Sequence, residues 1–205
     1  MTPHKLGSSE FSTEKYSSPA SQHKARSENV PKMAVAALST PLDSVETLPQ
    51  LLTRASASDS GLVYYTPEQK GLEGVSVTYR QLLEDAQQKA RLLQGIRGIS
   101  PSSIVLLHFN TQYEAIQWFW ASTLAGILPA ISTPFVNDPT QRKKHLLHLQ
   151  SLLNGPVVLT TQQLMPEFLG VEGLTIHTVE SLKTYGSLPI REKKANDTAV
   201  LMLTS

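Results

Sequence analysis

Polar side chains follow two apolar segments that are typical of buried strands. Thr204 and Ser205 come directly after the run 199–203, and His108 comes directly after the run 104–107. Ligands of parallel α/β sheets bind beyond the carboxyl ends of the strands, so hydroxyl and imidazole groups at these places are candidates for a binding site. Taken alone, Thr204 and Ser205 favour an ordinary polar end of a strand over a binding site. The expected role of His108, and of Asn110 after it, is a cap or a hydrogen-bonded buried polar group, and a role near a cleft is the alternative.

A second group of candidate residues is basic. His145 and His148 are three residues apart on a predicted helix and share a face with the run 142–144, which reads Arg-Lys-Lys. A metal site would need further ligands, and no partner cluster is visible in the sequence. The expected role of this face is a solvated basic surface, with attraction of an anion as the alternative.

The composition limits the class of protein. The chain has 205 residues, of which 40% are hydrophobic, and its net charge is +1, so one domain with a core is expected and a nucleic-acid partner is not favoured. It has no cysteine, which removes disulfides, thiolate metal sites and a cysteine nucleophile. No apolar run could span a bilayer and no secretory signal is visible, so a cytoplasmic protein with no membrane partner is expected.

The elements that would position these residues begin after a serine-rich stretch. Residues 1–40 are predicted to be a disordered leader, because few large apolar residues are available to offset the ordering entropy. From residue 41, helical and strand patterns alternate, which predicts an α/β fold with a mostly parallel sheet and flanking helices. Predicted strands lie near residues 62–65, 75–77, 104–107, 127–131, 157–159, 174–178 and 199–203, the last of them buried.

Helix boundaries and faces can also be predicted. Thr78 and Thr111 precede helical patterns and have Gln or Glu three residues later, which is the capping-box spacing. Ser44 is the predicted cap of an earlier helix over 48–55. Within the helix after Thr111, the periodicity predicts Trp120 on the core side and Trp118 on the other side.

Three segments together resemble the start of an adenylate-forming enzyme, the family of acyl-CoA synthetases and nonribosomal peptide synthetase adenylation domains. They read VTYRQLL at 77–83, IVLLHFNTQYEAIQWFWASTLAGILPAISTP at 104–134 and DTAVLMLTS at 197–205. In the family, the third segment continues as TSG(S/T)TGxPK, the ATP-phosphate loop. The HFN and WFW triplets of the second segment are similar to those of fungal synthetase-like proteins and acyl ligases of secondary metabolism.

The resemblance implies a fold and a reaction. The chain would be the first part of the family's large N-terminal domain, with residues 41–205 as a partial adenylation domain. In the family, a carboxylic acid attacks ATP to give an acyl-adenylate, and the acyl group passes to a thiol of CoA or of a carrier-protein phosphopantetheine. Thr204 and Ser205 are implied to begin the loop that binds the ATP phosphates, which Mg²⁺ normally bridges.

The same resemblance limits what this chain is expected to do. No position corresponds to the family's adenine or ribose motifs, acyl pocket or catalytic lysine, so no catalytic residue and no metal ligand is assigned. The chain is expected to be truncated and inactive alone, and to bind ATP, Mg²⁺ and CoA poorly. The alternatives are a non-catalytic binding or regulatory remnant of the same fold, or an unrelated doubly wound protein. The acid substrate is not predicted.

Overall fold

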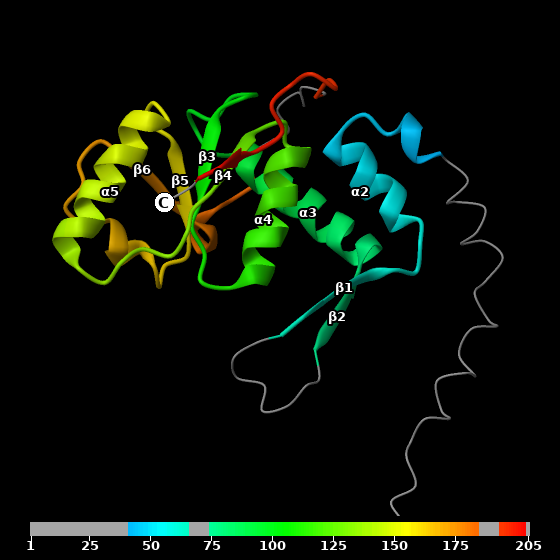
Figure 1. The fold of residues 1–205 in the computed structure, drawn as a ribbon, viewed down its shortest axis with the longest axis horizontal. Helices are drawn as coiled ribbons and strands as arrows, with labels where there is room; N and C mark the ends of the chain where they lie inside the picture. Colours follow the sequence, from blue (N-terminus) through cyan, green and yellow to red (C-terminus); the bar gives the residue numbers. More distant parts are fainter. Residues whose placement is uncertain (1–40, 66–73, 185–192, 204–205) are drawn as a thin grey trace, which may run out of the picture. The chain divides into compact units, whose positions relative to one another are not determined.

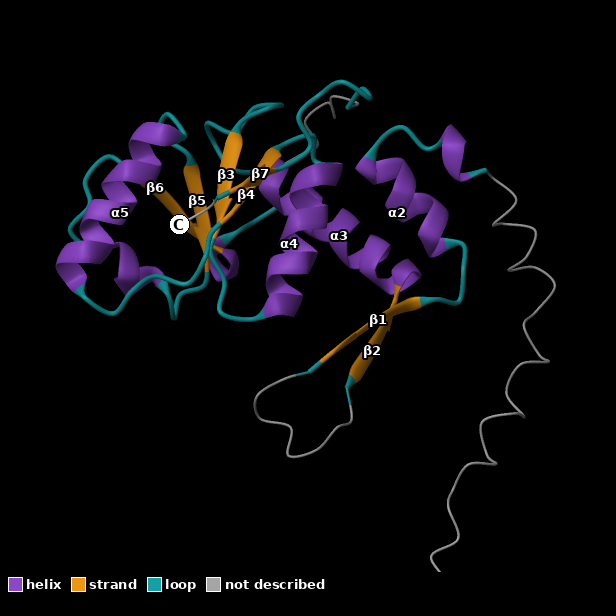
Figure 2. Ribbon diagram, viewed as in Figure 1, coloured by secondary structure: helices purple, strands orange, loops and turns teal. Residues whose placement is uncertain are grey.

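A five-stranded parallel sheet forms the centre of the fold (Figures 1 and 2). The computed structural model describes residues 41–65, 74–184 and 193–203, so the predicted leader and Thr204 and Ser205 lie outside the described residues. The strand order is β6-β5-β3-β4-β7, and every neighbouring pair is parallel. The strands are β3 (Ile104–Leu107), β4 (Leu128–Ile131), β5 (Val157–Thr160), β6 (Thr175–Thr178) and β7 (Leu201–Met202). The predicted parallel α/β fold is confirmed.

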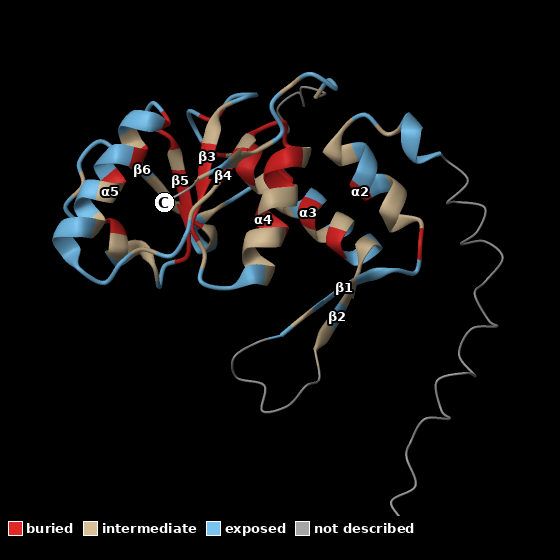
Figure 3. Cartoon of the chain, viewed as in Figure 1, coloured by how far each residue is buried: buried red, intermediate tan, exposed pale blue. Residues whose placement is uncertain are grey.

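Each face of the sheet is covered by helices because alternate residues of its central strands point to opposite sides. Val105 and Leu107 of β3 pack with residues of α3 (Tyr79–Gln94) and α4 (Gln112–Leu124). Leu106 points to the other face, where it packs with α5 (Pro139–Leu152) and with the short 3₁₀ helix η2 (Met165–Phe168). The buried residues accordingly concentrate in the sheet and on the helix sides that face it (Figure 3).

Further elements precede α3 and follow β6. The 3₁₀ helix η1 (Leu42–Ser44) leads into α2 (Leu48–Ser56), which packs against α3 and α4. An antiparallel hairpin of β1 (Gly61–Tyr64) and β2 (Val75–Thr78) comes next, and the Tyr64 ring stacks on the Tyr113 ring of α4, with centroids 4.3 Å apart. The 3₁₀ helix η3 (Val179–Ser181) follows β6. In the described ranges, no helix combines the length and apolar character needed to cross a membrane.

The predicted helix starts are confirmed at two helices and wrong at one. Thr78 caps α3 in a capping box with Gln81. The Thr111 hydroxyl accepts from the Glu114 backbone N–H and so caps α4. The cap of α2 is Thr47, in a capping box with Gln50, whereas the predicted cap Ser44 lies within η1. Since the Ser44 hydroxyl donates to the Pro41 carbonyl at 2.7 Å, it serves the preceding turn and not the helix.

The predicted orientation of the two tryptophans in α4 is wrong. Trp118 is only 4% exposed and belongs to the core between α3, α4 and the sheet, whereas Trp120 is half-buried. Helix α4 contacts α2 and α3 as well as the strands, so it has more than one buried side. A single apolar stripe identifies the core face only when a helix has one such face.

The last strand differs from the prediction in length and burial. A buried strand over 199–203 is predicted, but β7 has two residues and Met202 is 71% exposed. The reason is topological: β7 lies at the edge of the sheet and pairs only with β4 among the described strands. Side chains project to the faces of the sheet, and a strand with one neighbour has fewer side chains beside its own than a central strand has.

Candidate functional site

The carboxyl edge of the sheet is the candidate functional site. Since all five strands are parallel, the segments that follow β3, β4, β5 and β7 leave the sheet on this one edge. Met202 of β7 lies opposite Ile131 of β4, so Leu203 leaves the sheet beside the end of β4. Thr204 and Ser205 come next but lie outside the described residues. The contacts to ATP phosphates that the resemblance implies fall on these two residues and stay a prediction.

His108 ties two strands together at this edge. It follows β3 directly, and its backbone N–H donates to the Leu159 carbonyl of β5 at 3.0 Å. Its own carbonyl accepts from the Thr160 hydroxyl at 2.8 Å. The first of these bonds continues the β3–β5 pairing by one residue, and both hold the backbone of His108, a residue that is 3% exposed, at a fixed place.

The His108 imidazole reaches two further segments. Its Nδ1 lies 3.1 Å from the Ser132 hydroxyl after β4, and its Nε2 lies 3.2 Å from the Glu167 carboxylate of η2. The Phe135 ring stacks on the imidazole at 4.1 Å, and the Phe168 ring meets it edge-on at 5.2 Å. One side chain therefore joins the segments that follow β3, β4 and β5, and the expected role of a hydrogen-bonded buried group is confirmed.

The surroundings of the imidazole set its protonation. Burial lowers the pKa of His108, and the charge and hydrogen bond of Glu167 oppose this effect only in part. A neutral ring beside the Glu167 carboxylate must carry its proton on Nε2 and donate it there. Nδ1 is then an acceptor, and it competes with the Thr133 carbonyl, 2.9 Å from the same oxygen, for the single proton of the Ser132 hydroxyl. Because both ring nitrogens are engaged, this geometry suits a positioning role for His108.

The lowered pKa predicts a loss of stability in acid. A histidine whose pKa is lower in the folded than in the unfolded chain binds more protons when unfolded, so stability falls as the pH drops below about 6.5, the unfolded value. His177, whose pKa burial also lowers, acts in the same direction. Urea unfolding between pH 8 and pH 5 should show this decline, and His108→Gln should flatten it. An unchanged slope in both His108→Gln and His177→Gln would contradict the assignment.

A cavity of about 280 Å³ lies beside this network. It is lined by the start of α5, including Arg142 and Lys143, and by Glu167. Glu167 therefore has the buried His108 on one side and a cavity with two cations on the other. His145 is half-buried with its ring 5.7 Å from that of Phe135. Within the described ranges, no group of three or more histidine and carboxylate side chains could hold a metal ion.

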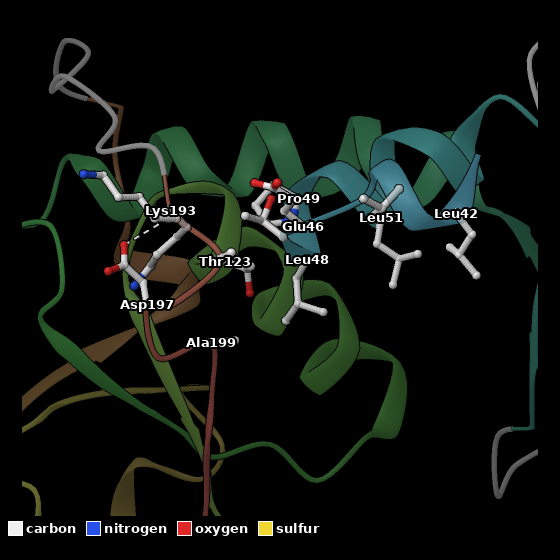
Figure 4. A pocket seen from close by; sticks show the side chains of 13 residues that line it. Leu42, Glu46, Leu48, Pro49, Leu51, Thr123, Lys193, Asp197 and Ala199 are labelled. Carbon is white, nitrogen blue, oxygen red and sulfur yellow. Dashed lines mark hydrogen bonds between the residues drawn. The ribbon is translucent and has the colours of Figure 1, made fainter. Parts of the chain in front are cut away.

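A second cavity, of about 340 Å³, lies between the start of α2 and the loop that leads to β7 (Figure 4). Asp197 of this loop accepts from the Lys194 backbone N–H at 3.1 Å and donates its own N–H to the Lys194 carbonyl at 3.0 Å. Asp197 therefore closes a turn ahead of β7. We name this cavity the α2 groove; its walls include Leu42, Val45, Leu48, Leu51, Thr123, Lys193, Asp197 and Ala199.

Three residues of the His108 network were not found from the sequence. Ser132, Phe135 and Glu167 come from segments 24 to 59 residues further along the chain. Nothing in their spacing marks them as partners of His108. The one usable signal is that Ser132 directly follows a predicted strand, as His108 does.

Comparison with solved structures defines the class of protein. An adenylation domain of a keto acid-selecting nonribosomal peptide synthetase module, bound to a keto acyl adenylate, matches 78% of this chain and 30% of its own, with a TM-score of 0.62 and 27% identity. The McyG A-PCP protein complexed with phenylalanyl-adenylate has a TM-score of 0.61 and 24% identity, with coverage of 78% and 26%. The chain therefore has the fold of the N-terminal domain of the adenylate-forming enzymes.

Sequence relatives narrow the family to fungal proteins. Microperfuranone synthase of Emericella nidulans is 54% identical over 165 residues, which are 77% of this chain and 18% of that protein. The nonribosomal peptide synthetase acyN of Ascocoryne sarcoides is 45% identical over 153 residues, with coverage of 72% and 16%. No family model matches the chain. The chain belongs with the adenylation proteins of fungal nonribosomal peptide synthetases and related synthetases, and spans less than a fifth of the length of these two relatives.

Proposed function

We propose that this chain is part of an enzyme that uses ATP to activate a carboxylic acid as an acyl-adenylate. The acyl group would then pass to a thiol of CoA or of a carrier-protein phosphopantetheine, in a pathway of secondary metabolism. The observation that carries the proposal is the 54% identity to a fungal synthetase over most of the chain. A cytoplasmic location is part of the proposal, consistent with the absence of cysteine.

The place of β7 supports this assignment. It delivers Leu203 to the carboxyl edge of the sheet, beside the segment that Ser132 begins and His108 holds. A Ser- and Thr-rich loop that continues from this edge could direct backbone N–H groups and hydroxyls at phosphate oxygens. Thr204 and Ser205 would be its first two residues, and Mg²⁺ would neutralise the phosphates that the loop binds.

The proposal includes a choice of acids to test. One structural neighbour selects a keto acid, and another holds a phenylalanyl-adenylate. A panel of α-keto acids, α-amino acids and fatty acids would therefore separate the classes of carboxylate. Keto acids come first, because the neighbour that selects them has the higher identity to this chain.

The test is acid-dependent exchange of labelled pyrophosphate into ATP. A longer chain that also contains the family's ATP-phosphate loop and its catalytic lysine should catalyse exchange with at least one acid class. The 205-residue chain should give no exchange above a blank without protein. Exchange catalysed by the 205-residue chain would overturn the expectation that this chain is inactive. If the longer chain catalyses no exchange with any acid, the proposed activity is wrong.

A further inference from the structure

The α2 groove has exposed apolar walls. Leu42 is 61% exposed and Leu51 is 37% exposed, and Leu48 between them is half-buried. Figure 4 shows these three side chains projecting from the same side of the η1–α2 segment. Thr123 of α4 and the loop 193–199 complete the cavity of about 340 Å³. Leucine side chains gathered in one groove are expected to bind an apolar occupant.

The sequence has an apolar segment shortly before the first residue of this groove, Leu42. Residues 33–38 read MAVAAL, the longest apolar run before residue 41, and only Ser39, Thr40 and Pro41 separate them from Leu42. Four Cα–Cα steps of about 3.8 Å keep Leu38 within about 15 Å of Leu42. Such a short connection gives the run a high effective concentration at the groove.

We infer that the run 33–38 is the occupant of the α2 groove and that it steadies the loop 193–199 ahead of β7. The contact is apolar, with Met33, Val35 and Leu38 as the large side chains available to meet the leucines of the groove. The domain then starts at residue 33, and the leader ends at Lys32 and not at residue 40. This inference does not depend on the proposed reaction.

One other segment of the chain could reach the same groove. Residues 188–190 read Leu-Pro-Ile and lie three positions before Lys193, which lines the groove. This run has three residues, and charged Arg191 and Glu192 follow it directly. The six uncharged, apolar residues of 33–38 can cover more of the groove, and the experiment separates the two occupants.

A disulfide test suits this chain because it has no native cysteine. Three variants of the 205-residue chain would be oxidised mildly. Each carries Ala199→Cys together with one leader cysteine: Ala34→Cys, Ala36→Cys or Ala37→Cys. Formation of the disulfide would be followed by intact mass. The matched controls pair Ala20→Cys with Ala199→Cys, and Ala36→Cys with Lys143→Cys on α5. At least one of the three test pairs should close roughly tenfold faster than either control.

A thermal measurement identifies the occupant without crosslinking. Leu38→Asp should lower the melting temperature by about 2–4 °C, and Leu6→Asp in the leader should leave it unchanged. Combining Leu38→Asp with Leu42→Asp should cost less than the sum of the two single changes, because both remove one contact. Equal disulfide rates in tests and controls would overturn the inference. So would a loss of stability in Ile190→Asp but not in Leu38→Asp, which would assign the groove to residues 188–190.

Discussion

Trp118→Ala is expected to lower the free energy of unfolding by about 3–5 kcal/mol, the range for a large aromatic side chain removed from a core. The Trp118 ring packs between α3 and the sheet, with the Phe109 ring parallel to it at 6.4 Å and the Lys89 ammonium 5.8 Å from its centre. Alanine would leave a cavity where three layers meet, and close packing prevents its full collapse. Urea denaturation at pH 7.5, followed by far-UV circular dichroism, measures the loss.

Trp120→Ala is the matched control, because it removes the same side chain two residues further along α4. Trp120 is half-buried and makes an edge-on contact with Phe119 at 5.3 Å. Its loss should cost less than half as much as that of Trp118, since less apolar area leaves contact with protein atoms. If Trp120→Ala lowers the free energy of unfolding more than Trp118→Ala does, the result supports the orientation that the periodicity predicts and contradicts the structure.

His108→Ala is expected to lower the free energy of unfolding by about 2–4 kcal/mol. The substitution removes a ring that packs against both Phe135 and Phe168 and takes a hydrogen-bond partner from Ser132 and from Glu167. Large-to-small substitutions in a core and unsatisfied buried polar groups each cost a few kcal/mol, and here they coincide. Because the backbone contacts to β5 remain, the fold itself should persist. Denaturant unfolding gives the magnitude.

Two variants separate the imidazole network from a general effect of histidine loss. His148→Ala removes an exposed histidine from α5 and should change stability by less than about 0.5 kcal/mol. Ser132→Ala removes one partner of His108 and should cost about 1 kcal/mol, and much less when His108 is already alanine. If the Ser132 change costs the same in both backgrounds, the contact between Ser132 and His108 does not contribute to stability.

Much of the secondary structure followed from local signals. The capping box at Thr78 and the side-chain cap at Thr111 act over three residues, so their effect on helix starts can be found without knowledge of the fold. The apolar runs of β3 and β5 reflect burial on both faces, which is typical of central parallel strands. At α2 the predicted cap, Ser44, was wrong, because Thr47 lies directly before Leu48 and forms a capping box with Gln50.

The strand order and the burial of individual side chains were not available from the sequence. Parallel strands can join the sheet on either side of their predecessors, and only the packing of the crossovers decides the order. That order makes β7 an edge strand beside β4, which leaves Met202 exposed. It also places α4 among several neighbours, so that Trp118 is buried although the periodicity of the helix predicted otherwise.

The amino-acid sequence by itself determined the alternation of helices and strands, the parallel sheet and, through three segments in order, the family. These properties depend on residue patterns within one element or between neighbouring elements. Only the tertiary structure decided which side chains meet at the carboxyl edge: His108 with Ser132, Phe135 and Glu167, across gaps of up to 59 residues. Such contacts depend on the order of the strands and on the path of each crossover connection, and no local sequence pattern encodes either.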